Sequence, residues 1–348
     1  MRKIFLLFIF FVRITPAAFS QGAVPSVTDT SNIRSALFES DELLNITLKF
    51  DISLYKRKKS DSEYLDGDLS YILEGDTIRE KIKLRSRGIF RRNYCELPPI
   101  MLNFKKKDSE KGLFNHINKL KMVTQCPHGN TEYILREYLA YKLYSTLTDS
   151  SFRVRLARVT YVNTARKNNA VTEYAFFIEP EELLAKRMNS IAINQNVTQK
   201  QVRPEIMDRM AIFNYMIGNT DWSVPISHNI QLFSEEKQGR NDLAIIVPYD
   251  FDFSGFVYAD YAAPFNGLKI SSVRQRLYLG ICREKDVLIK EVDEFVRKKP
   301  GLLNVIESFQ YLPDKSKKDM TAYLESFYKE VSKPDIFAKT ISIQCIKF

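Results

Sequence analysis

The stretch RVRLARVTYVNTARKNNAVTEYAFFIEP, residues 153–180, carries a clear strand pattern. Its first part, residues 153–163, alternates polar and apolar side chains, and residues 171–180 are rich in aromatic and β-branched types. The polar run TARKNNA divides the two parts. Alternation with a period of two is typical of strands with one buried face, so we predict two strands here.

Strand patterns continue from this stretch towards the N-terminus. We expect strands within LLNITLKFDISLY (43–55), DTIREKIKLRSRG (76–88), PIMLNFKK (99–106) and KLKMVT (119–124). The segment NTEYILREYLAYKLYSTLT, residues 130–148, instead places apolar residues at a helical period behind Asn130, a candidate N-cap. Residues 40–179 therefore read as a strand-rich lobe that contains one long helix.

Helical periodicity dominates the chain after residue 179. It is found in PEELLAKRM (180–188), RPEIMDRMAIFNYMIG (203–218), DVLIKEVDEFVRK (286–298) and KSKKDMTAYLESFYKEV (315–331). We therefore predict an α+β protein of two lobes, with the strand-rich lobe at residues 40–179. A mainly helical lobe, interrupted by one hairpin, is expected at residues 180–348.

The first 20 residues read as a secretory signal, because a basic start and an apolar run precede small residues before a cut after Ser20. The apolar run, Ile4 to Val12, is shorter than the roughly 20 residues that a bilayer span needs. Residues 21–39 then form a polar linker. We expect a mature protein without a membrane span, exported to the periplasm, the envelope or the cell exterior.

The net charge and the cysteine content limit the kinds of ligand and metal site that we expect. Much of the positive charge, which gives a formal net charge of +10, is concentrated in KIKLRSRGIFRRNY and NFKKKDSEK. It favours anionic partners without arguing for specific nucleic-acid binding. The four cysteines form no C-x-x-C pair, so no structural zinc site is expected. Export permits disulfides, and Cys95 with Cys126 is the first pairing we expect, with free buried cysteines as the alternative.

The stretch YMIGNTDWSVPISHNIQLF, residues 215–233, joins the end of a helix to a strand. A second strand, within LAIIVPY, follows after the polar connection SEEKQGRND, which indicates a hairpin. A hairpin brings its two ends together. The loop with Asp221, His228 and Asn229 should therefore lie beside the loop with Asp250 and Asp252.

Carboxylates and an amide at one hairpin end supply hard oxygen ligands, which suit Mg²⁺ or Mn²⁺. Phosphoryl-transfer enzymes use such a set, in which one Asp positions the attacking hydroxyl while an Asn and a second Asp hold metal on the phosphates. GNTDWSVPISHN followed by VPYDFD resembles the catalytic loop and metal-binding Asp of the spore-coat protein H (CotH) kinase family, and more faintly HipA-type kinases. The resemblance covers roughly residues 80–255.

The resemblance implies a two-lobed atypical protein-kinase-like fold, with ATP and Mg²⁺ or Mn²⁺ as cofactors. It makes Asp221 the catalytic Asp, Asn229 and Asp250 metal ligands, and Asp252 a second metal-binding Asp. Protein kinases place the catalytic Asp and the metal-binding Asn about five positions apart. Here they are eight apart, so the assignment requires the insertion SVPI to bulge outward.

The same resemblance implies a strand Lys paired with a Glu on the following helix. Lys121 and Glu137 fit that order, with Lys119, Lys105 and Glu132 as competing candidates. Around Gly88, the cationic side chains expected to face nucleotide or substrate phosphates are Arg85, Arg87 and Arg91.

Three functions follow as hypotheses. The first is an exported kinase that moves phosphate from ATP to a hydroxyl of a secreted or envelope protein. The second is a pseudokinase-like binding or scaffolding protein of the cell envelope. The third, a sugar hydrolase that uses two carboxylates, leaves the Lys, Glu and Arg-Gly elements without a role.

Overall fold

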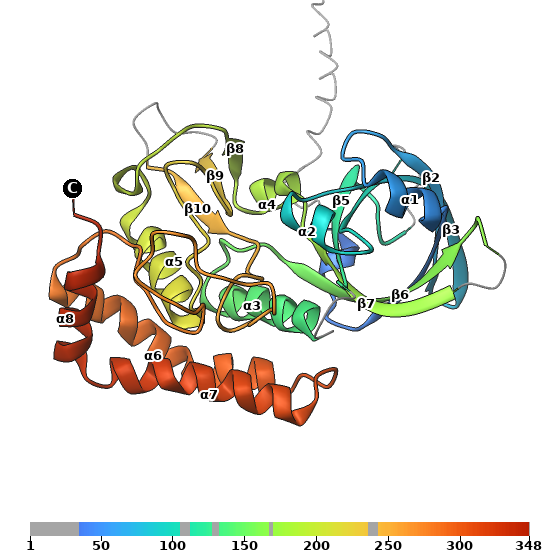
Figure 1. Cartoon of the computed structure of the whole chain (residues 1–348). Helices are drawn as coiled ribbons and strands as arrows, with labels where there is room; N and C mark the ends of the chain where they lie inside the picture. The colour runs from blue at the N-terminus through green and yellow to red at the C-terminus, as the bar shows by residue number, and fades with distance from the viewer. Residues whose placement is uncertain (1–34, 105–111, 127–131, 167–169, 236–242, 348) are drawn as a thin grey trace, which may run out of the picture. The chain divides into compact units, whose positions relative to one another are not determined.

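Seven strands close into a mixed β-barrel in the computed structural model of the chain (Figure 1). The structure describes residues 35–104, 112–126, 132–166, 170–235 and 243–347. The barrel strands are β1 (Leu44–Phe50), β2 (Leu65–Leu73), β3 (Asp76–Ser86), β4 (Ile100–Phe104), β5 (Lys119–Thr124), β6 (Val154–Asn163) and β7 (Ala170–Ile178). Around the barrel their order is β1-β2-β3-β4-β5-β7-β6.

The barrel closes through the pairing of β1 with β6. These strands run parallel, with Leu44 opposite Ala157 and Phe50 opposite Asn163, whereas the other neighbours in the barrel run antiparallel. The predicted pair of strands at residues 153–180 is confirmed as the hairpin β6–β7. This hairpin supplies the wall that both β1 and β5 join.

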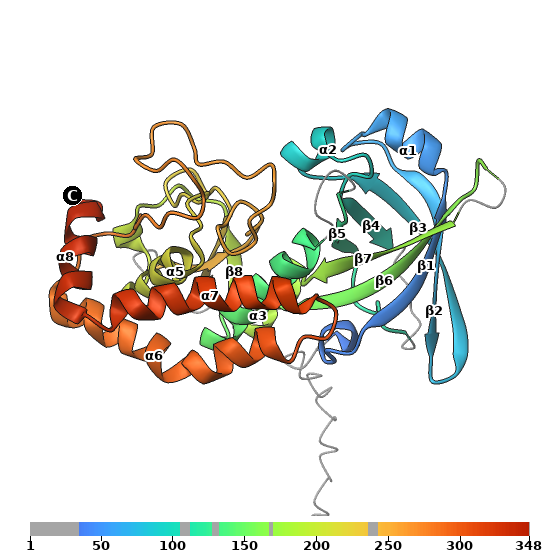
Figure 2. The ribbon, with the colours of Figure 1, turned by 60° about the horizontal axis from the view of Figure 1, so that its bottom comes forward.

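Two short helices lie between the barrel strands. The predicted strand at residues 43–55 ends early, because Asp51 accepts a hydrogen bond from the backbone N–H of Leu54 and starts α1 (Ile52–Lys58). The second helix, α2 (Phe90–Tyr94), follows β3. Figure 2 shows both helices near one end of the barrel.

The wall formed by β6 and β7 is buried on both faces. Inward residues such as Val159 and Phe177 belong to the apolar core inside the barrel. Outward residues such as Leu156 and Phe176 belong to a second core, which they share with α3 (Tyr133–Leu147) and the C-terminal helices. Burial of both faces ties the barrel to the elements that follow it.

The remaining elements are a small sheet and a set of helices. The sheet has the order β10-β9-β8, and its strands are β8 (Ser190–Ile193), β9 (Ile230–Glu235) and β10 (Ile245–Pro248). The helices are α4 (Glu181–Arg187), α5 (Pro204–Ile217), α6 (Lys285–Glu307), α7 (Asp314–Val331) and α8 (Pro334–Gln344), with short 3₁₀ turns at Ala36–Phe38 and Gln199–Gln201.

The predicted two-lobed kinase-like fold is wrong. The strands of the N-terminal half form a closed barrel, and the C-terminal half carries its own three-stranded sheet beside the helices. Residues Ser31–Phe348 form one compact unit. Alternation in the sequence identifies strands and their buried faces, but it contains no signal for the parallel pairing of β1 with β6 that closes the barrel.

Several local predictions are confirmed. The expected long helix is α3, and α5 begins at Pro204 and ends before Gly218. Cys95 is bonded to Cys126, as expected, and a second disulfide that was not predicted joins Cys282 to Cys345.

As a separate observation, none of the helices in the described ranges combines the length and apolar character that a membrane crossing requires.

Other predictions fall partly or wholly outside the described residues. These are the signal at residues 1–20, most of the linker at 21–39, and the candidate cap Asn130. Within the described part, the first helical residue of α3 is Tyr133.

Candidate functional site

The loop after α5 is held in place by asparagine side chains. Gly218 adopts a left-handed conformation with φ of 65°, and a Cβ there would lie 2.1 Å from the Tyr323 hydroxyl oxygen, so only glycine fits. Asn219 Nδ2 donates to Asn214 Oδ1 over 2.9 Å. Asn219 Oδ1 accepts from the backbone N–H of Asp221 over 3.1 Å. Asp221 is therefore fixed just beyond the end of the helix.

The insertion SVPI bulges outward only in part, because Val224 is fully buried whereas Pro225 and Ile226 are exposed. Ser223 and His228 exchange backbone hydrogen bonds of 3.0 and 2.9 Å, and the exposed residues 225–228 turn back between them. As a result, Asn229 Nδ2 donates to the backbone oxygen of Asp221 over 2.8 Å and to its Oδ2 over 2.9 Å. His228 Nε2 lies 2.8 Å from Asp221 Oδ1. The longer spacing thus still brings Asp221 and Asn229 into contact.

The β9–β10 hairpin brings the two predicted loops together. Ile230 pairs with Pro248, and the backbone N–H of Tyr249 donates to the backbone oxygen of Asn229 over 3.0 Å. Asn229, which accepts this hydrogen bond, and Asp250, which follows Tyr249, have positive φ values of 51° and 63°. Asn and Asp tolerate this conformation better than most residues. The predicted approach of the hairpin ends is therefore confirmed.

Three carboxylates converge beside this hairpin end. One carboxylate oxygen from each of Glu137, Asp250 and Asp252 lies within 4.8 Å of the others. We call these residues the acidic cluster. Asp250 is oriented by its own backbone N–H, which donates to the Tyr141 hydroxyl over 2.8 Å. Tyr141 and Glu137 both lie on α3, so this helix places two of the groups that shape the cluster.

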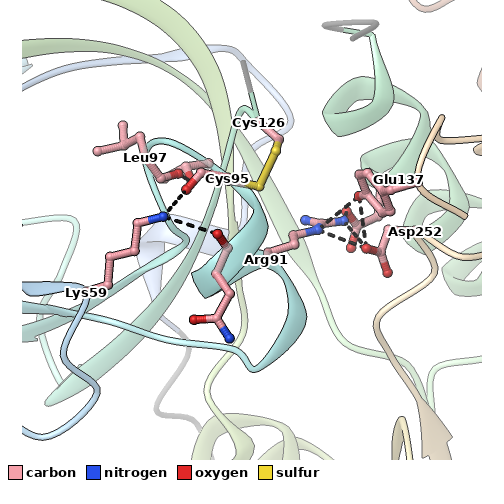
Figure 3. Close-up of a disulfide and its surroundings, with 10 residues drawn as sticks. Lys59, Arg91, Cys95, Leu97, Cys126, Glu137 and Asp252 are labelled. Atoms are coloured by element: carbon pink, nitrogen blue, oxygen red, sulfur yellow. Dashed lines mark hydrogen bonds and ion pairs between the residues drawn. A yellow bond between two sulfur atoms is a disulfide. The ribbon is translucent and has the colours of Figure 1, made fainter. Parts of the chain in front are cut away.

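A buried arginine occupies one side of the acidic cluster. Arg91 NH2 lies 2.5 Å from Glu137 Oε2 and 2.8 Å from Asp252 Oδ2. The Tyr261 hydroxyl donates to Asp252 Oδ2 over 3.0 Å and accepts from Arg91 Nε over 3.1 Å. Figure 3 shows Arg91 reaching Glu137 and Asp252 from α2, whose following residue, Cys95, is bonded to Cys126. The disulfide thus anchors the segment that carries Arg91.

The charges of the acidic cluster do not balance. Burial raises the pKa of Glu137 to about 8. The charge of Arg91 lowers this pKa, but the carboxylates of Asp252 and Asp250 raise it further. Burial also raises the pKa of Asp252. One guanidinium thus faces three carboxyl groups, and additional positive charge would be stabilised there.

The arrangement fits a small divalent cation. Glu137 Oε1 is buried and has no hydrogen-bond partner among the described residues. Carboxylate oxygens are the ligands that Mg²⁺ and Mn²⁺ prefer. The side-chain hydrogen bonds of Asn229 use its Nδ2, so these contacts leave its Oδ1 unused.

The predicted pairing of Lys121 with Glu137 is wrong. Among the described residues, Lys121 Nζ lies 2.8 Å from Glu181 Oε1, whereas Glu137 is bound by Arg91. Lys121 also lies over the ring of Tyr249, 5.4 Å from its centroid. Its positive charge is thus next to the residue that precedes Asp250, although it does not contact Glu137.

The competing candidates for this pair are placed elsewhere. Lys119 is exposed at the start of β5, and Lys105 lies outside the described residues. Glu132 Oε2 lies 3.9 Å from Arg136 NH2.

The three arginines around Gly88 do not share one environment. Arg85 lies over the ring of Tyr64, 5.4 Å from its centroid, and Arg91 is buried in the acidic cluster. Burial raises the pKa of Tyr141 and of Tyr249, and the charge of Arg87 opposes both shifts. Arg87 thus acts on two tyrosines that adjoin Asp250, and it also opposes the raised pKa of Tyr55.

Sequence reasoning missed three features of the site. Arg91 was expected to face phosphates, but it is the internal counter-ion of the acidic cluster. The sequence motifs do not include Tyr141 and Tyr261, which orient Asp250 and Asp252. A signal existed for Tyr141, which lies one helical turn after Glu137 and hence on the same face of α3.

Comparisons with known proteins add no family assignment: no protein-family model matches the chain, and a search of curated proteins returns no match. The likeness to spore-coat protein H kinases therefore rests on the quoted motifs alone.

Proposed function

We propose that the protein is an exported, metal-dependent phosphotransferase that moves the γ-phosphate of ATP to a hydroxyl group of a secreted or envelope protein. The observation that carries the proposal is the convergence of Glu137, Asp250 and Asp252 within 4.8 Å, beside the loop that holds Asp221 and Asn229. Two disulfides support export, because such bonds persist in oxidising compartments.

A bound Mg²⁺ or Mn²⁺ would be held by the acidic cluster with Asn229, and it would offset the charge of the ATP phosphates. Arg87 and Lys121 add positive charge on the side of Tyr249. Together these groups favour an anionic nucleotide at the hairpin end.

In the proposed transfer step, Asp221 acts as the general base. Its carboxylate is oriented by His228 at Oδ1 and by Asn229 at Oδ2. Asp221 accepts the proton of the substrate hydroxyl as the hydroxyl oxygen bonds to the γ-phosphorus. The bond from the γ-phosphorus to the bridging oxygen breaks, and ADP leaves.

A second candidate function is a binding or scaffolding protein of the envelope. The observation that favours it is Arg91, which already supplies an internal cation to Glu137 and Asp252. On this alternative, the acidic cluster is a structural ion network and needs no metal.

Isothermal titration of ATP into the protein, with and without Mn²⁺, distinguishes the phosphotransferase from the scaffolding protein. We expect Mn²⁺-dependent binding that weakens at least tenfold in Asp250→Asn. The control Asp76→Asn removes an exposed carboxylate after the β2–β3 turn and should bind like the parent. Asp221→Asn should retain binding but lose phosphate transfer to a substrate preparation.

Failure of the folded parent to bind ATP in Mn²⁺ would overturn the phosphotransferase proposal and favour the scaffold. Equal binding by the parent and Asp250→Asn would remove the acidic cluster from nucleotide recognition.

A further inference from the structure

A cavity of 720 Å³ lies at the end of the barrel where β1 and β6 stop. Its walls come from α1, from the segment after α2, and from the adjoining ends of β6 and β7. We call it the mouth cavity. Barrel mouths are common ligand sites, and this volume falls within the usual range of roughly 300–1,000 Å³ for small-molecule pockets.

Side chains from inside the barrel form the floor of the mouth cavity. Tyr161 is opposite Val171, and Val159 is opposite Glu173, so Val171 and Glu173 share the inward face of the wall with the buried Tyr161 and Val159. The Tyr161 hydroxyl is buried and has no hydrogen-bond partner among the described residues. The cavity therefore meets the ring of Tyr161, while its hydroxyl oxygen is closed to solvent.

Positive charge is in excess around the mouth cavity. Lys56 Nζ lies 2.5 Å from Glu96 Oε1, so this pair is satisfied. Arg57 and Arg166 also line the cavity, and neither has an ion-pair partner within the described part of the chain. Two guanidinium groups are thus free to bind an anion, for which their planar donors are well suited.

The other polar groups of the wall are already used by the fold. Asn163 Oδ1 accepts from the backbone N–H groups of Ile52 and Ala165, and its Nδ2 donates to Ser53 Oγ. Leu97 and Val171 contribute apolar surface. The groups left for a ligand are therefore two guanidinium groups, the Glu173 carboxyl and apolar surface that includes the ring of Tyr161.

We propose that the mouth cavity is a binding site for a small organic anion with an apolar body, such as an aromatic or aliphatic acid. Its acidic group is bound by Arg57 and Arg166, and its apolar body rests on Leu97, Val171 and the ring of Tyr161. The site uses none of the residues of the acidic cluster, so it is independent of the proposed phosphotransferase activity.

The state of Glu173 is consistent with an anionic ligand. Burial raises the pKa of this carboxyl group, Lys56 opposes the shift and Glu96 adds to it. A carboxyl group whose ionisation is opposed by burial repels an anionic ligand less.

The probe is 8-anilinonaphthalene-1-sulfonate, an aromatic sulfonate whose fluorescence rises in apolar sites, with octanoate as an aliphatic competitor. We expect saturable binding that octanoate displaces. The double variant Arg57→Gln/Arg166→Gln should weaken binding at least tenfold. The matched control Lys49→Gln/Arg79→Gln removes the same charge from exposed positions on β1 and β3 and should bind like the parent.

A second variant tests the space rather than the charge. Val171→Trp fills the mouth cavity without changing the net charge, and it should weaken binding to a similar extent. Because Val171 is 50% exposed, the substitution should leave the cooperative thermal transition in place. Unchanged binding in both variants, or no saturable binding to the parent, would overturn the proposal.

Discussion

The acidic cluster and the mouth cavity hold charge in opposite ways. In the cluster, three buried or half-buried carboxyl groups face a single guanidinium, that of Arg91. Around the mouth cavity, positive side chains outnumber the carboxyl groups, and Arg57 and Arg166 have no ion-pair partner within the described ranges. The cluster is short of positive charge and the mouth cavity is short of negative charge.

The two regions also differ in burial, and burial decides whether an unbalanced charge needs a partner within the protein. Glu137 is fully buried, which raises its pKa to about 8, so its ionised form requires an offsetting charge inside the protein or from a bound cation. The guanidinium groups at the mouth cavity adjoin water, which stabilises them without a partner. The cluster therefore needs Arg91 for stability, whereas the mouth cavity can remain open for a ligand.

The largest expected effect comes from removing the internal counter-ion. Arg91→Met should lower the free energy of unfolding by about 3–5 kcal/mol, because Glu137 and Asp252 would lose the guanidinium that contacts both of them. Chemical denaturation at pH 7 measures this. The control Arg79→Met alters an exposed arginine on β3 and should change stability by about 0.5 kcal/mol or less. A loss below about 1 kcal/mol in Arg91→Met would show that the ion network is not needed for the fold.

The next largest loss of stability is expected from removing either of the two disulfides. The bond between Cys95 and Cys126 closes a separation of 31 residues, and that between Cys282 and Cys345 one of 63 residues. Replacing either pair with serine should cost about 2–4 kcal/mol, with the larger loss for the longer loop. Urea denaturation under otherwise identical conditions provides the values.

Only the first of these disulfides should be coupled to Arg91, because Cys95 directly follows α2. A double-mutant cycle with Arg91→Met should give a coupling of about 1 kcal/mol for the pair Cys95 and Cys126. The cycle with Cys282 and Cys345 should give less than about 0.5 kcal/mol. Equal coupling in both cycles would mean that the disulfide does not position Arg91.

Local features of the candidate site were predictable from the sequence because they depend on neighbouring residues. The loop after α5 begins at a glycine, and the hairpin that follows must bring Asn229 close to Asp250 whatever the rest of the chain does. The disulfide between Cys95 and Cys126 was also expected, since both cysteines occur in one strand-rich segment.

Long-range pairing was not predictable in the same way. Barrel closure depends on the parallel contact of β1 with β6, two strands that are separated by most of the N-terminal half. Glu137 was paired with Lys121 because a strand lysine before a helix fitted the order of a kinase. The actual partner, Arg91, comes from a short helix after β3, and periodicity does not indicate which cation a buried carboxylate will meet.

The smallest expected effect concerns Glu173 at the mouth cavity. Burial raises the pKa of its carboxyl group above the ordinary 4.5, and the charged groups that act on it are Lys56 from α1 and Glu96 from the segment after α2. The folded state therefore holds this proton at pH values where the unfolded chain has released it. The resulting loss of stability is absent below about pH 4, develops as the pH rises above 4.5, and is complete above the folded-state pKa.

Glu173→Gln removes this titration. The variant should therefore be more stable than the parent at pH 7, and the two should converge below about pH 4. Because Glu173 is only partly buried, solvent screening should limit the gain to a few tenths of a kcal/mol. Paired urea titrations at pH 4 and pH 7 measure the difference. A variant less stable than the parent at pH 7 would mean that the charged form of Glu173, paired with Lys56, stabilises this end of the barrel.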